Sequence, residues 1–191
     1  MRIFLPLIAL AALSGCISFG AEPPPYLMTL SADEEIATGA TRTAAMGQAI
    51  TIERPEVPQS LITNRVPVRT GETTIAYLQN AVWVDTPNEL FRALVSEVVA
   101  ARTGRVVLDP ATYATDPGTI VRGELREFGL DARTQEVVIV YDASINMPGG
   151  VRTRRFEARE QVFAQDGQSV AMGLNRAANR MAVEISDWIT G

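Results

Sequence analysis

Histidine and lysine are absent from this chain of 191 residues, so all 17 of its basic side chains are arginines. Histidine is the usual general base near neutral pH and the commonest metal ligand, and lysine is the usual Schiff-base nucleophile. Their absence excludes a Ser-His-Asp or Cys-His arrangement, a histidine-based zinc site and a P-loop lysine. Paired carboxylates could still catalyse a reaction, but no motif places such a pair. We therefore expect no enzymatic activity, no metal and no cofactor.

The chain also has a single cysteine and no excess of positive charge. Cys16 is the only cysteine, so an intramolecular disulfide is impossible. The 22 acidic side chains outnumber the basic ones and give a formal net charge of −5 at pH 7. Phosphate backbones are bound by a basic excess or a basic stripe. We therefore expect no nucleic-acid partner.

The first sixteen residues have the pattern of a bacterial lipoprotein export signal. Arg2 precedes an apolar run over residues 3–13, and Leu13-Ser14-Gly15-Cys16 fits a lipobox. The run is shorter than the roughly 20 residues of a membrane-spanning helix, so we interpret residues 1–15 as a signal peptide. The alternatives are an ordinary secretory signal with an incidental cysteine and an N-terminal core helix.

This interpretation makes Cys16 the lipidated N-terminus of the mature protein. Residues 16–25 end in three consecutive prolines and should form a stiff tether to the membrane. Ile17 follows the cysteine, where an aspartate would retain a lipoprotein in the inner membrane under the best-known sorting scheme. We therefore expect a lipid-anchored protein in the outer membrane that faces the periplasm.

Residues 26–191 have the length and pattern of a single domain. Runs typical of strands span residues 26–30, 49–53, 66–68, 73–78, 105–108, 119–130, 136–146 and 151–163. Pro67 cannot donate a ladder hydrogen bond, so its strand should lie at a sheet edge or be irregular. This order of elements predicts an α+β fold with an antiparallel-rich mixed sheet, covered on one face by two amphipathic helices.

The two helices are predicted from capping residues and apolar spacing. Thr86-Pro87-Asn88-Glu89 has the pattern of a helix start, and Gly104 should end that helix in a left-handed conformation. The second helix should span about residues 169–189. We expect Trp83 and Trp188 to lie in the core beside these helices rather than to stack on a ligand.

Two surface features are candidates for binding a partner. The first is a face of alternating charge on two strands, formed by Arg122, Glu124, Arg126, Arg155, Glu157 and Arg159. Solvated ion pairs between the strands are the simpler interpretation, and a protein-docking surface is the alternative. The second is the proline-bounded segment 55–69, where Val57, Leu61 and Ile62 would gain little by burial in a monomer. The alternative for these three residues is that they cap the core.

Several motifs together resemble a known family. They are the lipobox, a tyrosine-led strand soon after it, an Ile-x-Ile-x-x-Pro-x-x-Pro strand and loop, the sequence Asn64-Arg65-Val66-Pro67-Val68-Arg69, and Tyr77 and Trp83 before an amphipathic helix. With these motifs the chain resembles the ABC-type transport auxiliary lipoproteins, the paraquat-inducible-type lipoproteins that accompany mammalian cell entry (MCE) domain transporters. The resemblance runs from Cys16 through the final helix. It departs from the family at Ser169-Val170-Ala171-Met172, where a tyrosine usually stands.

The resemblance implies a non-enzymatic envelope component. Such a protein would work with an MCE-domain protein and an ABC permease and ATPase, and the system would move lipids between the inner and outer membranes. We expect Val57, Leu61, Ile62, Arg65 and Tyr77 to contribute to docking on the MCE-domain protein. A homo-oligomer stays open. The alternatives are an activator or assembly factor of another envelope machine, such as a cell-wall synthase, and a carboxylate-dependent hydrolase.

Overall fold

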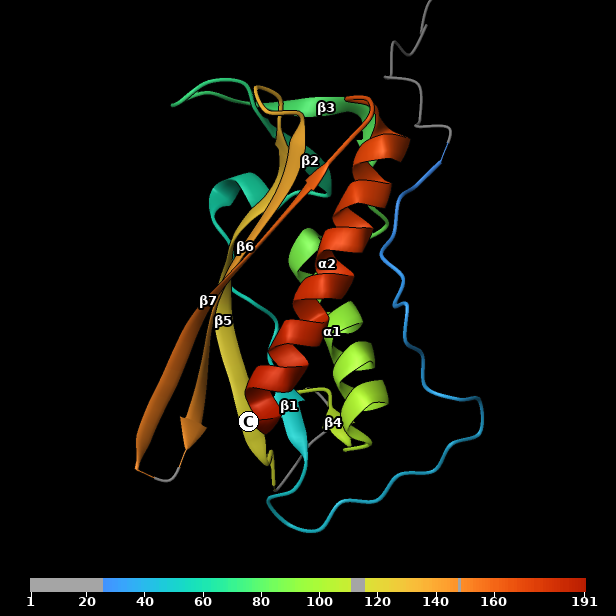
Figure 1. Cartoon of the computed structure of the whole chain (residues 1–191), viewed down its shortest axis with the longest axis vertical. Helices are drawn as coiled ribbons and strands as arrows, with labels where there is room; N and C mark the ends of the chain where they lie inside the picture. Colours follow the sequence, from blue (N-terminus) through green and yellow to red (C-terminus); the bar gives the residue numbers. More distant parts are fainter. Residues whose placement is uncertain (1–25, 111–115, 148) are drawn as a thin grey trace, which may run out of the picture.

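The computed structural model describes residues 26–110, 116–147 and 149–191, so Cys16, the expected signal peptide and the expected tether lie outside the described residues. The described chain forms a seven-stranded mixed sheet, and helices α1 (Pro87–Thr103) and α2 (Gly167–Thr190) pack together against it (Figure 1). The strands are β1 (Ile50–Ile52), β2 (Arg65–Arg69), β3 (Ile75–Val82), β4 (Val107–Leu108), β5 (Thr119–Asp131), β6 (Glu136–Met147) and β7 (Gly150–Gln161). The predicted α+β class is confirmed.

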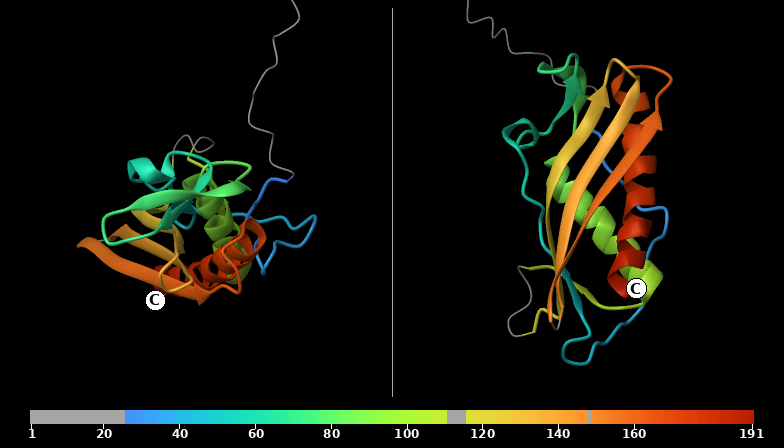
Figure 2. Two further views of the ribbon diagram at one scale, coloured as in Figure 1. Left: turned by 90° about the horizontal axis from the view of Figure 1, so that it is seen from above. Right: turned by 60° about the vertical axis from the view of Figure 1, so that its left-hand side comes forward.

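Strand β5 is the centre of the sheet. It pairs antiparallel with β6 along its length, and β6 pairs antiparallel with β7. On the other side of β5, β1 pairs parallel with its first residues and β2 pairs parallel with its last residues. Strands β3 and β4 extend the sheet beyond β2 and β1, and Figure 2 shows the long β5–β6–β7 ribbon beside α2. The two ends of β5 therefore pair with two different strands, β1 at its start and β2 at its end.

Alternating apolar residues of β6 build the core on the helix side of the sheet. Ile139 and Tyr141 are at most 1 % exposed, and the Tyr141 ring lies 5.2 Å from the Phe91 ring of α1. Trp188 of α2 meets Phe156 of β7 edge-on at 5.6 Å. These contacts join the apolar stripes of both helices to the sheet. Trp83 is fully buried and Trp188 is 9 % exposed, so their predicted core positions are confirmed.

The helix ends follow the sequence pattern with two differences. Helix α1 begins at Pro87 and ends before Gly104, whose φ of 68° is the expected left-handed conformation. The Thr86 side chain does not cap the helix, because its hydroxyl donates to Asp85 instead. Helix α2 begins at Gly167, two residues before the predicted start, since the Asp166 side chain accepts a hydrogen bond from the Ser169 N–H at 2.8 Å.

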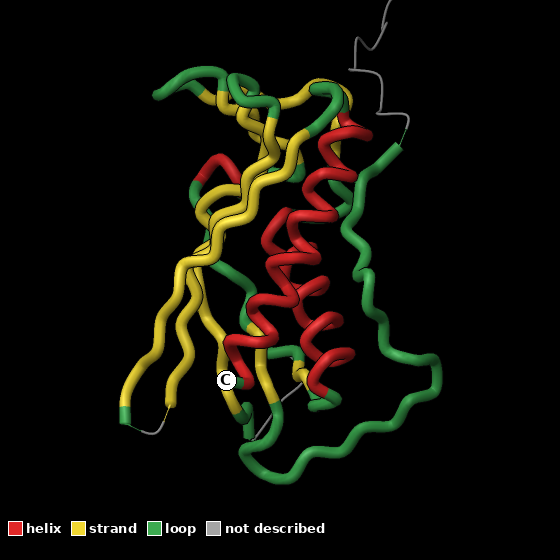
Figure 3. The backbone as a smooth tube through the Cα atoms, in the orientation of Figure 1, coloured by secondary structure: helices red, strands yellow, loops and turns green. Residues whose placement is uncertain are grey.

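One strand prediction is wrong, and the structure decides between the two alternatives of another. Residues 26–30 do not form a strand, because only Met28 makes a single bridge, to Trp83. The chain then continues as a loop, drawn in green in Figure 3, to the start of β1. Strand β2 is irregular, as one alternative expected, but it is not an edge strand: it lies between β3 and β5. Its pairing with β3 shifts register between Arg65 and Pro67, which accommodates the missing proline N–H.

The predicted lattice of charged side chains is present across β5, β6 and β7. Its short contacts join Arg122 to Glu53, Arg126 to Glu124, Arg155 to Asp142 and Arg159 to Glu157, with N–O distances between 2.6 and 3.1 Å. Asp142 of β6 completes the lattice between the two predicted strands, since it also lies 3.6 Å from Arg126. The arginines are about half exposed, so each pair stabilises the fold by under about 1 kcal/mol.

Candidate partner-docking site

The proline-bounded segment between β1 and β2 is a fixed loop. Its first part runs beside β5, where the Glu56 N–H donates to Gly123 O at 2.9 Å and the Leu125 N–H donates to Glu56 O at 2.8 Å. The buried Asn88 side chain of α1 donates to Pro55 O at 3.0 Å. The short 3-10 helix η1 (Gln59–Leu61) follows. The segment is therefore held against both layers of the domain.

The structure separates the three apolar residues of this segment. Leu61 is 1 % exposed and belongs to the core, and Val57 is half-buried against the core. Ile62 is 53 % exposed. The interpretation that these residues cap the core is thus correct for Leu61 and in part for Val57. A partner can therefore contact the side chain of Ile62 at the surface, whereas the side chain of Leu61 lies within the core.

Arg65 and Tyr77 lie together beside η1. The Tyr77 hydroxyl donates to Ser60 O at 3.2 Å, which ties strand β3 to the 3-10 helix. The Arg65 guanidinium carbon lies 4.7 Å from the centroid of the Tyr77 ring, a cation–π geometry. Arg65 stays exposed in this position. The structure therefore places three of the predicted docking residues, Ile62, Arg65 and Tyr77, at the surface next to η1.

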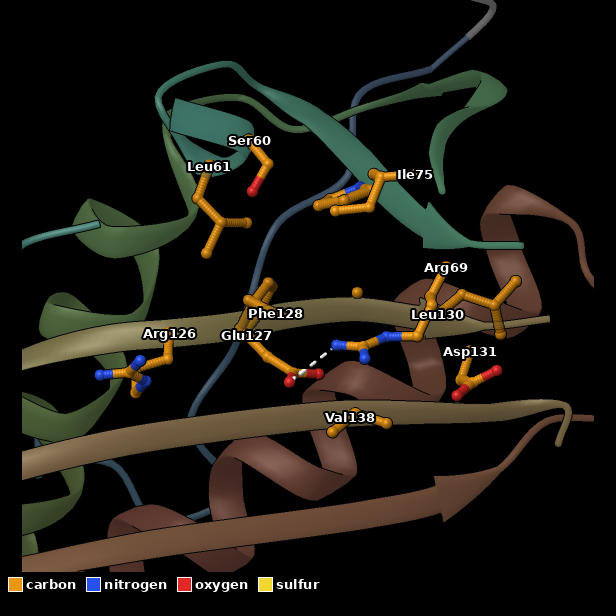
Figure 4. Close-up of a pocket in the computed structure, with 12 residues that line it drawn as sticks. Ser60, Leu61, Arg69, Ile75, Arg126, Glu127, Phe128, Leu130, Asp131 and Val138 are labelled. Carbon is orange, nitrogen blue, oxygen red and sulfur yellow. Dashed lines mark ion pairs between the residues drawn. The ribbon is translucent and has the colours of Figure 1, made fainter. Parts of the chain in front are cut away.

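A small pocket next to η1 was not predicted from the sequence. Ser60 and Leu61 from η1, Ile75 from β3 and Val138 from β6 line it, and an ion pair between Arg69 and Glu127 crosses it at 2.8 Å (Figure 4). Its volume is about 80 Å³. Small-molecule sites usually measure roughly 300–1,000 Å³, so this pocket is of a size for one aliphatic side chain rather than a whole lipid.

A sequence signal for this pocket exists in β6. Residues 137–141 are all apolar, and the strand therefore departs from strict alternation. Val138 and Val140 point away from the helices, yet they are at most 8 % exposed. A continuous apolar run is typical of a strand that is covered on both faces. The run could have indicated that the loop and long charged side chains cover this part of the outer face.

Both acidic residues that line the pocket form ion pairs, Glu127 with Arg69 and Asp131 with Arg133. Asp131 accepts hydrogen bonds from Arg133, and the side-chain bond holds the pKa of the Asp131 carboxyl below its usual range. A carboxyl that acts as a general acid near neutral pH needs a raised pKa instead. Within residues 26–110, 116–147 and 149–191, no group of three or more acidic or cysteine side chains could hold a metal ion.

The chain matches the family model described as the ABC-type transport auxiliary lipoprotein component over residues 29–186. That range contains every strand of the sheet and nearly all of α2. No curated protein sequence gives a significant match to this chain.

Two solved structures have a similar fold. One, described as an uncharacterized protein, has a TM-score of 0.67 and 17 % identity, and the match covers 78 % of this chain and 96 % of that protein. The other is a Xanthomonas campestris protein of the DUF330 family, with a TM-score of 0.64, 18 % identity and coverage of 86 % and 93 %. At these identities the likeness concerns the fold. In the part of the chain that the structure describes, no helix is long and apolar enough to cross a membrane.

Proposed function

Because this chain belongs to the family of ABC-type transport auxiliary lipoproteins, we propose that it is a lipid-anchored component of an MCE-type ABC transport system. Its partners are an MCE-domain protein and, with it, an ABC permease and ATPase, and the system moves lipids between the inner and outer membranes. The match of the family model to residues 29–186 is the observation that carries this proposal.

Cys16 provides the anchor in this proposal. Its acyl chains hold the protein in the outer membrane, and the domain faces the periplasm. Two acyl chains give stable anchoring where one chain gives only marginal binding. Residues 16–25 then set how far the domain can move from the bilayer.

The surface of this chain that binds the MCE-domain protein comprises Ile62, Arg65 and Tyr77. Ile62 offers an exposed apolar side chain on a loop whose backbone is already fixed, so little conformational entropy is lost on binding. The Arg65 guanidinium, stacked on Tyr77, is an aromatic–arginine pair of the kind enriched at protein interfaces. The adjacent pocket accepts one aliphatic side chain of the partner. Val57 and Leu61 pack on the core and hold the loop in place.

Affinity purification from detergent-solubilised envelopes tests this function. The wild-type protein should bring MCE-domain and ABC subunits with it, and Ile62→Asp should reduce their recovery about tenfold, because a charge would replace an apolar contact. Met172→Asp is the matched control, since Met172 is 50 % exposed but lies on α2. Recovery of cell-wall synthases without transporter subunits would contradict the proposal. Equal loss in both variants would contradict the docking surface alone.

A further inference from the structure

Three loops leave the sheet at the same end. Residues Ile75, Arg69, Asp131, Glu136 and Gln161 pair in that order across five strands. The loops 70–74, 132–135 and 162–166 continue directly from these paired residues. We call this end of the domain, together with Tyr26, the tether end.

Tyr26 belongs to the tether end because it contacts the start of α2. Its hydroxyl lies 3.0 Å from the position that a Cβ of Gly167 would take, and it lines a groove with Gln165 and Tyr77. Figure 1 shows the beginning of the described chain near the β7–α2 connection. Residues 16–25 therefore join the domain here, and they span at most about 36 Å. A membrane anchor at Cys16 keeps this end within that distance of the bilayer.

Phe163 is the most exposed large apolar side chain at this end. It is 100 % exposed in the loop between β7 and α2. The loop is held on both sides of it, because the Val162 N–H donates to Gln135 O at 3.0 Å and the Gln165 side chain donates to Ala132 O at 3.0 Å. Ile75, the first residue of β3 and 58 % exposed, adds apolar surface at the same end of the sheet. A monomer in water gains nothing from an aromatic ring in this position.

We propose that the tether end rests on the bilayer and that Phe163 inserts into the boundary between lipid headgroups and acyl chains. This inference relies on the proposed anchoring through Cys16. Aromatic rings favour this boundary, and apolar side chains of peripheral proteins bind there. Arg133 is already paired with Asp131, and Glu72 and Asp166 add negative charge to the same end. The contact is therefore apolar, and it does not require anionic lipids.

Tryptophan fluorescence in vesicles tests this orientation. The full-length lipidated protein carrying Phe163→Trp is reconstituted into phosphatidylcholine vesicles whose acyl chains carry bromine, a contact quencher. Met46→Trp is the control, because Met46 is 88 % exposed and lies just before β1. Strand β1 pairs with the first residues of β5, and the length of β5 places these residues about 40 Å from the tether end. Trp83 and Trp188 are buried and contribute the same background to both variants.

We expect brominated lipid to lower the emission of the tryptophan at position 163 at least twofold and to leave that at position 46 unchanged. Equal quenching at both positions, or none at position 163, would overturn the inference while co-flotation with vesicles still supports the anchor. Failure to co-float would overturn the anchor and this inference together. A concentration-dependent blue shift of the tryptophan at 163 without vesicles would assign the ring to a second copy of the chain and overturn the membrane contact.

Discussion

The buried side chain of Asn179 donates a hydrogen bond to Ser31 O at 2.9 Å, across 148 positions of sequence. Its Oδ1 accepts a hydrogen bond from the Asp33 N–H at 2.8 Å. One amide of α2 thus satisfies two backbone groups of a segment that has no strand partner there. This pairing fixes the course of the chain between Tyr26 and β1 over the helices.

Asn179→Ala should release this segment. Two backbone groups lose their partners, so we expect the free energy of unfolding to fall by about 1–3 kcal/mol. Urea denaturation measures the loss, and hydrogen exchange at the Ser31 and Asp33 amides should become faster. Asn175→Ala is the control, because the half-buried Asn175 side chain accepts only the Ser31 N–H in this segment. An Asn175→Ala effect as large as that of Asn179→Ala would contradict the central role of Asn179.

Mutation of Leu61 should lower the stability of the protein far more than mutation of Ile62. Leu61→Ala removes a core side chain and should cost about 2–5 kcal/mol of stability. Ile62→Asp alters an exposed position and should change stability by about 0.5 kcal/mol or less. Thermal unfolding of the two purified variants separates them. If Ile62→Asp unfolds the protein, its loss of transporter subunits cannot be assigned to docking.

The position of the anchor is testable in cells. Cys16→Ser removes the thiol that would carry acyl chains, so we expect the protein to accumulate as an unprocessed precursor or as a soluble form. Fractionation followed by immunoblotting measures both. Density-gradient separation of the wild-type protein should place it with outer-membrane markers. Normal membrane retention of Cys16→Ser would rule out this anchor.

The regular elements could be predicted because their local signals agree with their packing. The alternation in β6, and Pro87 and Gly104 at the ends of α1, correspond to the observed strand and helix. The position of β2 could not be predicted, because a proline usually excludes a central strand. Here Gly129 lets the backbone of β5 approach Pro67, and this contact depends on residues far apart in sequence.

The docking site was only partly predictable for a similar reason. Composition indicated that residues 55–69 carry apolar side chains on a loop, but it did not separate Leu61 from Ile62. Their exposure depends on how η1 turns against β3, which Tyr77 fixes through Ser60 O. The contact between Arg65 and the Tyr77 ring likewise arises only when β2 pairs with β3.

Acid should weaken the charged lattice through Asp142. Hydrogen bonds from Arg155, at 2.6 Å, hold the pKa of the Asp142 carboxyl below its usual value. A lowered pKa in the folded state adds stability above the unfolded-state pKa of about 4, and this contribution is lost as the pH falls through the folded-state pKa. Asp142→Asn should therefore cost more at pH 6 than at pH 2.5, by under about 1 kcal/mol because the pair is partly exposed.

Denaturant titrations at the two pH values measure this difference. Glu184→Gln is the control, since Glu184 makes a longer contact of 3.4 Å with Arg154. An equal cost of Asp142→Asn at both pH values would mean that the carboxylate charge contributes nothing to the lattice.

The close approach of β2 to β5 makes Gly129 the residue on which the pocket depends. An added Cβ at Gly129 would lie 2.3 Å from Pro67 O, far inside contact distance, so one strand would have to move. We expect Gly129→Ala to destabilise the protein by about 1–3 kcal/mol. Gly104→Ala is the control, because its Cβ meets no atom within 4 Å and only its φ of 68° opposes the change, which should cost about 1–2 kcal/mol. Since these two strands carry Arg69 and Glu127, whose ion pair crosses the pocket, Gly129→Ala, unlike Gly104→Ala, should also weaken recovery of transporter subunits.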